Sequence, residues 1–347
     1  MKACASIKGI SVILCCYNSA TRIEETIQAL AAQQVDSRIE WEVVLVDNAS
    51  TDNTVELAVR LWKKYNAIAP LRIVQEPTPG LGNARNRGIQ EATYSILLFC
   101  DDDNWLTPRY VQGMYVIMEN DKRIAACGGT GIPVFETPEP RWFNEYKEAF
   151  ALGPQDNNKE NGRILNLYGA GLAVRRLAWD TLHASGFNPL MKGRVGKKLS
   201  SSEDTELTYA FALMGYKLYY ARDLRFFHFL PRQRLTFSYL KKLFIAFGSD
   251  GPVRNLYYAN LSERPYHKRL VNWNIHFSLS LIRLVKYLII PPKKYGRQVY
   301  FNWCIAYIRE LVYIRSQYPS LVKRISALKG IGAPPVIRDI KLKDLIF

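Results

Sequence analysis

Short apolar runs alternate with helix-length amphipathic segments from Ile10 onward, and this alternation restricts the fold more than any other feature of the chain. The apolar runs are 10–16, 41–46, 71–74, 95–100 and 124–127, and the amphipathic segments are 21–33, 53–64, 83–92 and 108–119. Continuous apolar strands separated by helices are what a parallel sheet covered on both faces requires. We therefore predict an α/β fold built on a doubly wound, mostly parallel sheet.

Polar side chains follow several of these strands. Right-handed crossovers place the strand-to-helix loops of such a sheet at one edge, where open α/β sheets bind their ligands. The loops concerned are 17–18, 47–52, 79–82 and 101–104. We expect them to meet in one site.

The second half of the chain is less regular. We expect a strand over 164–174, a loop over 192–202, a helix over 203–214, strands over 216–220 and 224–229, and helices from residue 235 to the end. The chain is accordingly divided into an α/β domain at 8–232, with halves 8–130 and 131–232, and a basic helical extension at 233–347.

The net charge of +16 is unevenly distributed. Residues 1–173 hold 17 basic and 21 acidic residues, whereas residues 174–347 hold 30 and 10. A basic half of this kind indicates an anionic partner. Six cysteines lie mostly in apolar runs without C-x-x-C spacing, and the N-terminus has no apolar stretch of signal-peptide length, so we expect reduced thiols and a cytoplasmic protein.

Three consecutive carboxylates, Asp101, Asp102 and Asp103, stand at the end of an apolar strand. Their mutual repulsion calls for a cation, and Mg²⁺ or Mn²⁺ prefers such oxygen ligands while substrate phosphates complete the shell. The alternative is a solvated turn that caps the helix starting near Pro108. We favour the ligand site because of its place at the sheet edge.

Two further loops offer groups for a nucleotide. Asp47 and Asn48 suit contacts to a base or ribose, although residues 50–52 also suit the cap of the next helix. The Gly80–Gly88 segment suggests a dinucleotide fingerprint, but Arg85 stands at the third glycine and would block close packing. A helix N-terminus with two arginines instead suits a pyrophosphate.

Two later motifs are ambiguous. Glu203 and Asp204 open a helix, where they either compensate its dipole or supply a general base that deprotonates an acceptor hydroxyl. His228 is either a metal ligand or a buried structural histidine between phenylalanines.

The order and spacing of these motifs resemble a family 2 glycosyltransferase of the inverting GT-A type. The resemblance covers roughly residues 8–250 and rests on residues 13–18, 46–52, 82–88, 99–105, 169–171, 203–204 and 228. Each motif is weak alone, and six motifs in the right order, followed by His228, are specific. The Q-x-x-R-W element of processive synthases is missing after His228, which favours transfer of a single sugar.

The resemblance implies roles for individual residues and for the two halves of the domain. Residues 8–130 would bind the nucleotide-sugar and residues 131–232 the acceptor. The implied nucleotide-sugar residues are Tyr17, stacked on the base, Asn18, Asp47, Asn48, Arg85, Asp101 and Asp102; the implied metal residues are Asp103, Asp101 and His228; and the implied catalytic residues are Asp204 as base with Glu203 beside it. Asn48 stands where relatives that recognise uracil often carry Asp, so the donor nucleotide stays open.

A basic, apolar segment at 270–300 indicates contact with an anionic membrane surface. His276, Ser280 and Arg283 fall on one helical stripe and leave a wide apolar face, as in a helix that lies in a membrane interface. A helical subdomain with a solvated basic face explains the pattern equally well. Nucleic acid is disfavoured because no nucleic-acid-binding fold accompanies the charge.

We therefore expect a metal-assisted glycosyltransferase that uses Mn²⁺ or Mg²⁺, with a nucleotide-sugar donor and a glycan or lipid-linked acceptor. Its expected location is the cytoplasm or the cytoplasmic face of a membrane. The alternatives are a catalytically silent nucleotide-sugar-binding or membrane scaffold protein on the same fold and, more distantly, a NAD-dependent enzyme.

Overall fold

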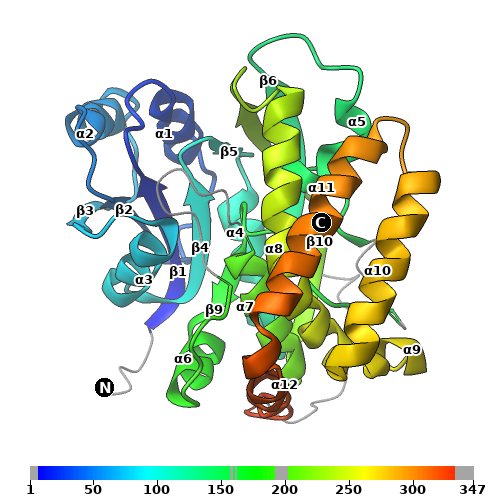
Figure 1. The fold of residues 1–347 in the computed structure, drawn as a ribbon. Coiled ribbons are helices and arrows are strands. Elements are labelled where there is room, and N and C mark those ends of the chain that lie inside the picture. The colour runs from blue at the N-terminus through cyan, green and yellow to red at the C-terminus, as the bar shows by residue number, and fades with distance from the viewer. Residues whose placement is uncertain (1–6, 157–158, 161, 192–201, 333–347) are drawn as a thin grey trace.

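The computed structural model describes residues 7–156, 159–160, 162–191 and 202–332, and shows a mixed sheet flanked by helices, with a helical block at one side (Figure 1). The expected loop at 192–202 lies outside the described residues except for Ser202. None of the described helices is long and apolar enough to cross a membrane.

Within the described part of the chain, eight strands form the central sheet, and the predicted mostly parallel arrangement is confirmed. In spatial order they are β3 (Leu71–Gln75), β2 (Trp41–Asp47), β1 (Ile7–Cys16), β4 (Tyr94–Asp101), β9 (Ala173–Arg175), β6 (Ile124–Phe135), β10 (Lys217–Leu230) and β5 (Asn104–Leu106). Only β9 and β5 run against their neighbours.

Three strand predictions of the second half need correction. The strand expected at 164–174 is wrong: β8 (Arg163–Ile164) pairs with β7 (Lys159–Glu160) in a separate sheet, and only Ala173–Arg175 joins the main sheet. Gly171 has a φ of +63°, which interrupts an extended chain between them. The two strands expected at 216–220 and 224–229 are one strand, β10, with an irregular register between Tyr220 and Arg225. β5 was not predicted.

Helices cover both faces of the sheet, as the apolar runs predicted. Alternate residues of β1 point to opposite faces: Val12 belongs to the core beneath α1 (Ile23–Ala31), α2 (Thr54–Lys64) and α4 (Tyr110–Asn120). Ile13 belongs to the core shared with α3 (Leu81–Glu91), α6 (Arg176–Ala184) and α7 (Glu203–Leu213).

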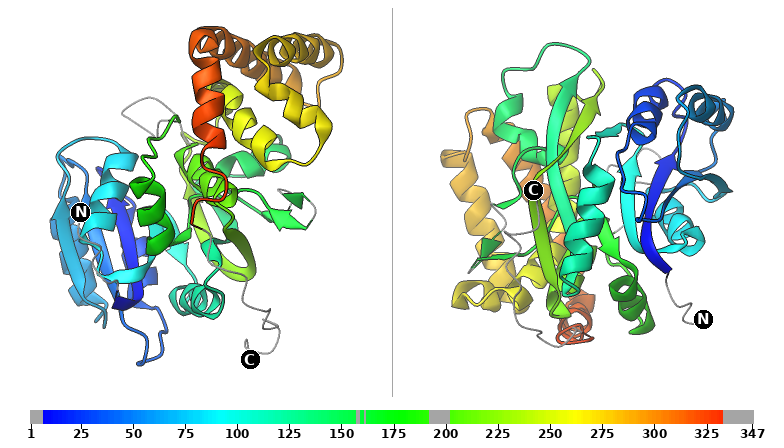
Figure 2. Two further views of the ribbon diagram at one scale, coloured as in Figure 1. Left: turned by 90° about the horizontal axis from the view of Figure 1, so that it is seen from below. Right: turned by 180° about the vertical axis from the view of Figure 1, so that it is seen from behind.

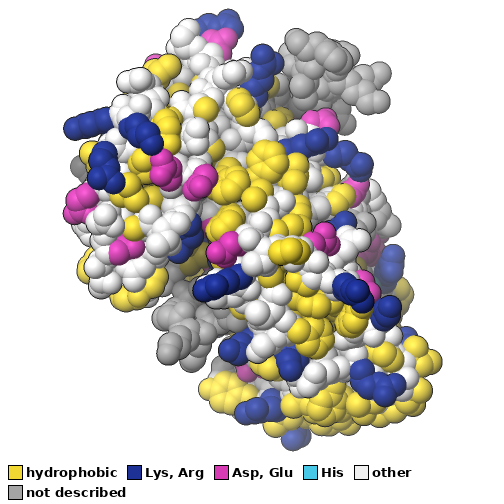
Figure 3. Space-filling view, turned by 90° about the horizontal axis from the view of Figure 1, so that it is seen from above, with side chains coloured by type: hydrophobic (Ala, Val, Ile, Leu, Met, Phe, Trp, Pro, Cys, Tyr) yellow, Lys and Arg dark blue, Asp and Glu magenta, His cyan; other side chains and the backbone are white. Residues whose placement is uncertain are grey.

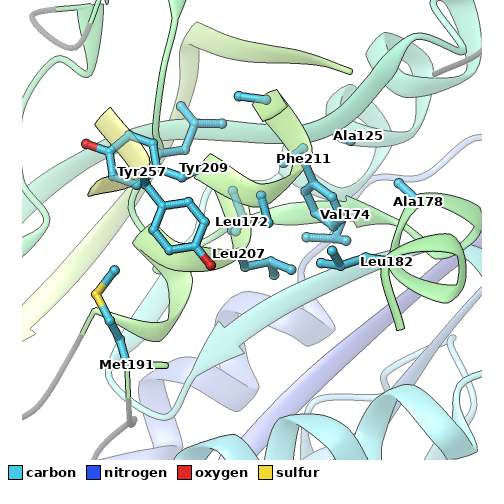
Figure 4. Packing of buried hydrophobic residues seen from close by; sticks show 14 of the residues in the cluster. Ala125, Leu172, Val174, Ala178, Leu182, Met191, Leu207, Tyr209, Phe211 and Tyr257 are labelled. Carbon is cyan, nitrogen blue, oxygen red and sulfur yellow. The ribbon is translucent and has the colours of Figure 1, made fainter. Parts of the chain in front are cut away.

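The second core is also filled from the C-terminal helices. Leu207 and Phe211 of α7 pack in one cluster with Val174 of β9 and with Leu172 just before it, and Tyr257 stacks on Tyr209 with ring centroids 6.1 Å apart (Figure 4). Buried residues of the last helices, such as Tyr307 and Leu321, join the same cluster. The helical part of the chain therefore completes the core of the α/β part.

The expected helices after residue 235 are present as far as residue 332, and the rest of the predicted helical segment lies outside the described residues. They are α8 (Phe237–Leu261), α9 (Pro265–Lys268), α10 (Trp273–Ile289), α11 (Gly296–Tyr313) and α12 (Tyr318–Ser326). α8 packs against α7 and α11, and α10 lies at the outer edge with α11 on its inner side (Figure 2). The five described cysteines are free and buried, as expected.

Candidate functional site

A cavity of about 710 Å³ opens where β1 and β4 end, which is within the range of small-molecule sites. Its walls come from the β1 and β4 loops, the start of α3, the start of α7, the end of β10, and α8. Nine of the predicted site residues line this cavity, namely Tyr17, Asn48, Arg85, Asp101, Asp102, Asp103, Glu203, Asp204 and His228. Asn18 and Asp47 are the two that do not.

The sheet must curl to bring these residues together. β4 ends at Asp101 and β5 begins at Asn104, so only two residues connect them, and such a connection spans at most about 11 Å. β5 pairs with β10, with Asn104 opposite His228. Because β5 follows β4 so closely and pairs with β10, His228 near the end of β10 lies next to the carboxylates at the end of β4.

Asp101, Asp102 and Asp103 form a turn that we call the acidic turn, and each of these carboxylates lies near a guanidinium group. Asp101 Oδ1 lies 3.6 Å from Arg85, and Asp102 Oδ2 lies 2.6 Å from Arg22 and also accepts a hydrogen bond from the Ser19 hydroxyl. Asp103 Oδ2 lies 3.0 Å from Arg234. The repulsion that we expected a cation to relieve is thus already reduced by three arginines.

The carboxylates and guanidinium groups of the acidic turn shift one another's pKa values. Burial raises the pKa of Asp102, and the neighbouring Asp103 raises it further, whereas Arg22 opposes both. Burial alone would lower the pKa of Arg22 and of Arg234, but the aspartates raise both above the ordinary value. The two arginines therefore stay protonated and keep the turn compact.

Asp103 and His228 are buried and adjacent. His228 Nε2 lies 3.6 Å from Asp103 Oδ1, and the buried Nδ1 of His228 has no hydrogen-bond partner. Within the described ranges, no group of three or more His, Cys, Asp or Glu side chains is arranged to hold a metal ion, and Asp101 does not join the pair. One carboxylate and one imidazole are ligand types that suit an ion whose remaining ligands are phosphate oxygens, but Arg234 already lies 3.0 Å from Asp103 Oδ2 and 3.3 Å from His228 Nε2.

Arg85 lies between the acidic turn and the start of α7. Its side chain is buried, lies 3.4 Å from Glu203 Oε1 as well as near Asp101, and stacks on the ring of Phe99 at 5.1 Å. Burial alone would lower its pKa, and the surrounding carboxylates raise it instead. The glycine that a dinucleotide fingerprint would place here is thus replaced by a fixed positive charge.

Asp204 is held by main-chain donors. Its Oδ2 accepts the Gly169 N–H at 2.6 Å, and its Oδ1 accepts the Thr205 N–H at 2.7 Å. Burial raises the pKa of Asp204 above the ordinary 3.8, although Arg85 and the two N–H donors oppose the rise. A positioned carboxylate with a raised pKa is suited to accept a proton.

The β1 and β2 loops place the other predicted residues. Tyr17 is half-exposed and lines the cavity, so its ring is free to stack on a base. The Asn18 side chain accepts the Thr51 N–H at 2.8 Å. Asp47 is buried and accepts the Ser50 N–H at 3.1 Å. The Asn18 carboxamide and the Asp47 carboxylate thus bond to the main chain of the loop that follows β2. The contacts of both residues with a nucleotide remain predictions.

Asn48 lines the cavity, but its side chain bonds to the chain before α3. Its amide group donates to the Thr78 carbonyl at 2.7 Å, and its carbonyl oxygen accepts the Gly80 N–H at 2.7 Å. It therefore shapes the entrance to α3, and its contact with a base remains a prediction.

Arg22 and Arg234 line the cavity but are not among the residues predicted from the sequence. Arg22 opens α1, and Arg234 follows β10 by four residues, so neither lies in a recognised motif. The only signal for Arg234 is its position six residues after His228, whose Nε2 it approaches to 3.3 Å.

The cavity continues into an aromatic wall. Side chains from residues 146–150, α8 and α11 form this wall, notably Tyr146, Phe150, Tyr239, Phe244, Phe247 and Tyr300. Arg254 and Lys293 add two cations. The cavity therefore has a charged end between the sheet loops and an aromatic end against the helical block.

Comparisons with known proteins find relatives of part of this chain. Poly-beta-1,6-N-acetyl-D-glucosamine synthase of Staphylococcus aureus (strain COL) is 28% identical over 128 residues, 37% of this chain and 29% of the relative. EpsH of Bacillus subtilis (strain 168) is 26% identical over 119 residues, 34% and 33% of the two chains. The match thus spans about a third or less of these curated relatives.

The fold has solved counterparts. The structure of mannosyltransferase PcManGT from Pyrobaculum calidifontis in complex with GDP-Man and Mn²⁺ aligns over 90% of this chain and 91% of that chain, with a TM-score of 0.56 and 19% identity. At this identity the likeness shows a shared GT-A-like fold. The model of glycosyl transferase family 2 matches residues 11–182, which include β1 to β4 and the acidic turn. Residues 11–182 of this chain therefore form a glycosyl transferase family 2 domain.

Proposed function

We propose that this protein is an inverting glycosyltransferase that moves one sugar from a nucleoside-diphosphate sugar to a hydroxyl group of a glycan or lipid-linked acceptor. One observation carries the proposal: the positioned carboxylate of Asp204 and the Asp103–His228 pair line the same cavity. A base and a diphosphate-binding centre in one cavity are the two parts that such a transfer needs.

The charged end of the cavity suits the donor. Tyr17 supplies an exposed aromatic ring for the base, and Arg85 supplies a fixed positive charge at the start of α3. A helix N-terminus and a guanidinium group both favour a diphosphate. Arg22 and Arg234 keep the acidic turn folded while the donor is absent.

A divalent cation, Mn²⁺ or Mg²⁺, completes the proposal. Asp103 and His228 would hold it, and the PcManGT structure, described as containing Mn²⁺ with GDP-Man, supports this choice. When bound, such an ion neutralises charge that develops on a diphosphate leaving group. Arg234, which lies 3.0 Å from Asp103 Oδ2, would add a second positive charge for the diphosphate.

Asp204 takes the proton of the acceptor hydroxyl. The hydroxyl oxygen bonds to the anomeric carbon as the bond to the diphosphate oxygen breaks, so a single displacement inverts the configuration. The N–H groups of Gly169 and Thr205 fix the carboxylate, so that its position does not depend on the acceptor. The aromatic end of the cavity is the surface left for the acceptor.

Substitution of Asp204 tests this assignment. A panel of nucleotide-sugars is first screened with Mn²⁺ for thermal stabilisation, which identifies the donor. Asp204→Asn keeps the shape of the side chain, and we expect unchanged donor stabilisation with transfer reduced about 10²- to 10⁴-fold. Asp223→Asn is the matched control, because Asp223 is exposed and does not line the cavity.

Two results decide between the proposal and a catalytically silent binding protein. Full transfer by Asp204→Asn contradicts the role of Asp204. Donor stabilisation without transfer to any hydroxyl acceptor or to water, in the unmodified protein, favours the silent binding protein. For the cation, EDTA is expected to remove donor stabilisation, and stabilisation that persists in EDTA contradicts binding through Asp103 and His228.

A further inference from the structure

Helix α10 packs against the protein through its polar side. His276 and Ser280 are buried, and His276 Nδ1 lies 2.5 Å from the Tyr318 hydroxyl while its Nε2 contacts the Tyr307 hydroxyl. Arg283 lies over the ring of Trp303 at 5.5 Å. The polar stripe that the sequence revealed therefore faces α11 and α12, contrary to the usual arrangement of a surface helix.

The apolar side of α10 faces outward as a consequence. Ile282 is 63% exposed, Val285 is 56% exposed and Ile289 is 68% exposed. Ile275, Leu281, Leu288 and Ile290 extend the same stripe. We call these seven residues the α10 face. Figure 3 shows hydrophobic side chains gathered along the edge of the molecule where the helical block lies, with Lys and Arg among them.

The charges around the α10 face have one sign. Residues 273–332 contain ten Lys and Arg residues and a single acid, Glu310. Lys286, Lys294 and Arg297 are exposed next to the face. An apolar helix surface bordered by exposed cations is the pattern of a helix that lies in the interface of an anionic bilayer.

We propose that the α10 face docks on an anionic lipid bilayer, with α10 parallel to the membrane surface. A second copy of the chain fits less well, because a two-fold contact would set this basic surface against itself. A parallel orientation also agrees with the length of α10, which has 17 residues where a membrane span needs about 20 apolar ones.

Docking in this way brings the cavity close to the bilayer. Lys293 follows α10 by four residues, lies over the ring of Tyr146 at 4.8 Å, and lines the cavity together with Tyr300 of α11. The aromatic end of the cavity therefore adjoins the α10 face. If the proposed transfer is correct, this position selects a lipid-linked acceptor over a soluble glycan; the docking itself does not depend on the transfer.

Vesicle co-sedimentation of the full chain tests the docking. The vesicles contain phosphatidylcholine alone or phosphatidylcholine mixed with phosphatidylglycerol. We expect binding to the mixed vesicles, and a partition coefficient lower by on the order of a hundredfold in the triple variant Ile282→Glu, Val285→Glu, Ile289→Glu. The matched control is Ile7→Glu with Ile68→Glu and Leu177→Glu, three side chains exposed elsewhere at 58%, 92% and 65%. The control also adds acidic charge, so it separates the α10 face from net charge.

A second variant tests the cations without touching the apolar residues. Lys286→Gln with Lys294→Gln is expected to weaken binding to the mixed vesicles about fivefold for each charge removed. Circular dichroism and thermal melting confirm that each variant is folded. Release of nucleoside diphosphate, measured without vesicles, reports on the proposed function separately.

The outcomes are distinct. Loss of binding in the triple variant with retention in the control supports the docking. The proposal is overturned if the unmodified protein binds neither kind of vesicle, or if the triple variant binds the mixed vesicles as well as the unmodified protein does. A concentration-dependent dimer that the triple variant abolishes, with vesicle binding unchanged, assigns the face to a second copy and also overturns the proposal.

Discussion

A single methyl group at Gly169 tests whether the position of Asp204 matters for the reaction. The Gly169 N–H donates to Asp204 Oδ2, and a Cβ atom built on Gly169 would lie 2.4 Å from that oxygen. Ordinary van der Waals contact begins at 3.4 Å, so Gly169→Ala must displace the carboxylate by about 1 Å. Gly169 does not have a left-handed φ, and alanine can therefore adopt its backbone conformation.

The expected loss follows from this displacement. A misplacement of about 1 Å at a reacting group costs on the order of 10²-fold in rate, or about 2.7 kcal/mol in activation free energy. Gly169 does not line the cavity, so the affinity for the donor should be unchanged. Overpacking lowers the free energy of unfolding by about 1–3 kcal/mol, which calls for assays well below the melting temperature.

The assay measures sugar transfer at saturating donor, together with thermal stabilisation by the donor and Mn²⁺. Gly113→Ala is the matched control, because a Cβ atom there would lie 2.5 Å from Leu224 Cδ2, so it also overpacks, while Gly113 belongs to α4 and does not line the cavity. We expect Gly113→Ala to keep the transfer rate of the unmodified protein below its melting temperature. Transfer by Gly169→Ala within twofold of that level would refute the reasoning, as would a loss of donor stabilisation equal to the loss of transfer.

Two further predictions concern stability. Burial and Arg283 lower the pKa of His276 from 6.5 to about 4, so the stability contributed by neutral His276 is complete above pH 6.5 and is lost as the pH falls toward 4. This loss amounts to about 3 kcal/mol, and the difference in unfolding free energy between the unmodified protein and His276→Phe, measured by urea titration, should shrink by that amount; a pH-independent difference contradicts it. Gly88→Ala places a Cβ atom 2.3 Å from Ile13 Cγ2, so it should lower the unfolding free energy by about 1–3 kcal/mol, and an unchanged urea midpoint contradicts close packing of α3 on β1.

Local rules were enough to predict the first half of the fold. Continuous apolar strands separated by helices imply a covered parallel sheet, and crossover handedness places the loops at one edge. Asp101 and Arg85 were therefore expected in one site before any coordinates, and they lie 3.6 Å apart. The same rules failed over 165–172, between β8 and β9, where apolar residues that pack in the core do not form a strand.

Pairings between distant residues could not be predicted in this way. Arg22 meets Asp102 across 80 residues of sequence, and Arg234 meets Asp103 only because the turn into β5 brings the end of β10 to the acidic turn. A sequence pattern records which residues share a strand edge or a helix face. It does not record how the sheet curls.

In the basic C-terminal half of the chain, too, the sequence determined one property and the tertiary structure another. Periodicity by itself determined that α10 has a polar stripe and an apolar stripe, since both follow from the positions of residues along one helix. Only the tertiary structure decided which stripe faces inward. His276 finds the hydroxyl groups of Tyr307 and Tyr318 in the helical block, so burying the polar stripe leaves few groups unpaired. The apolar stripe is then left at the surface, and this inversion, which depends on partners from two other helices, is the basis for the proposed membrane contact.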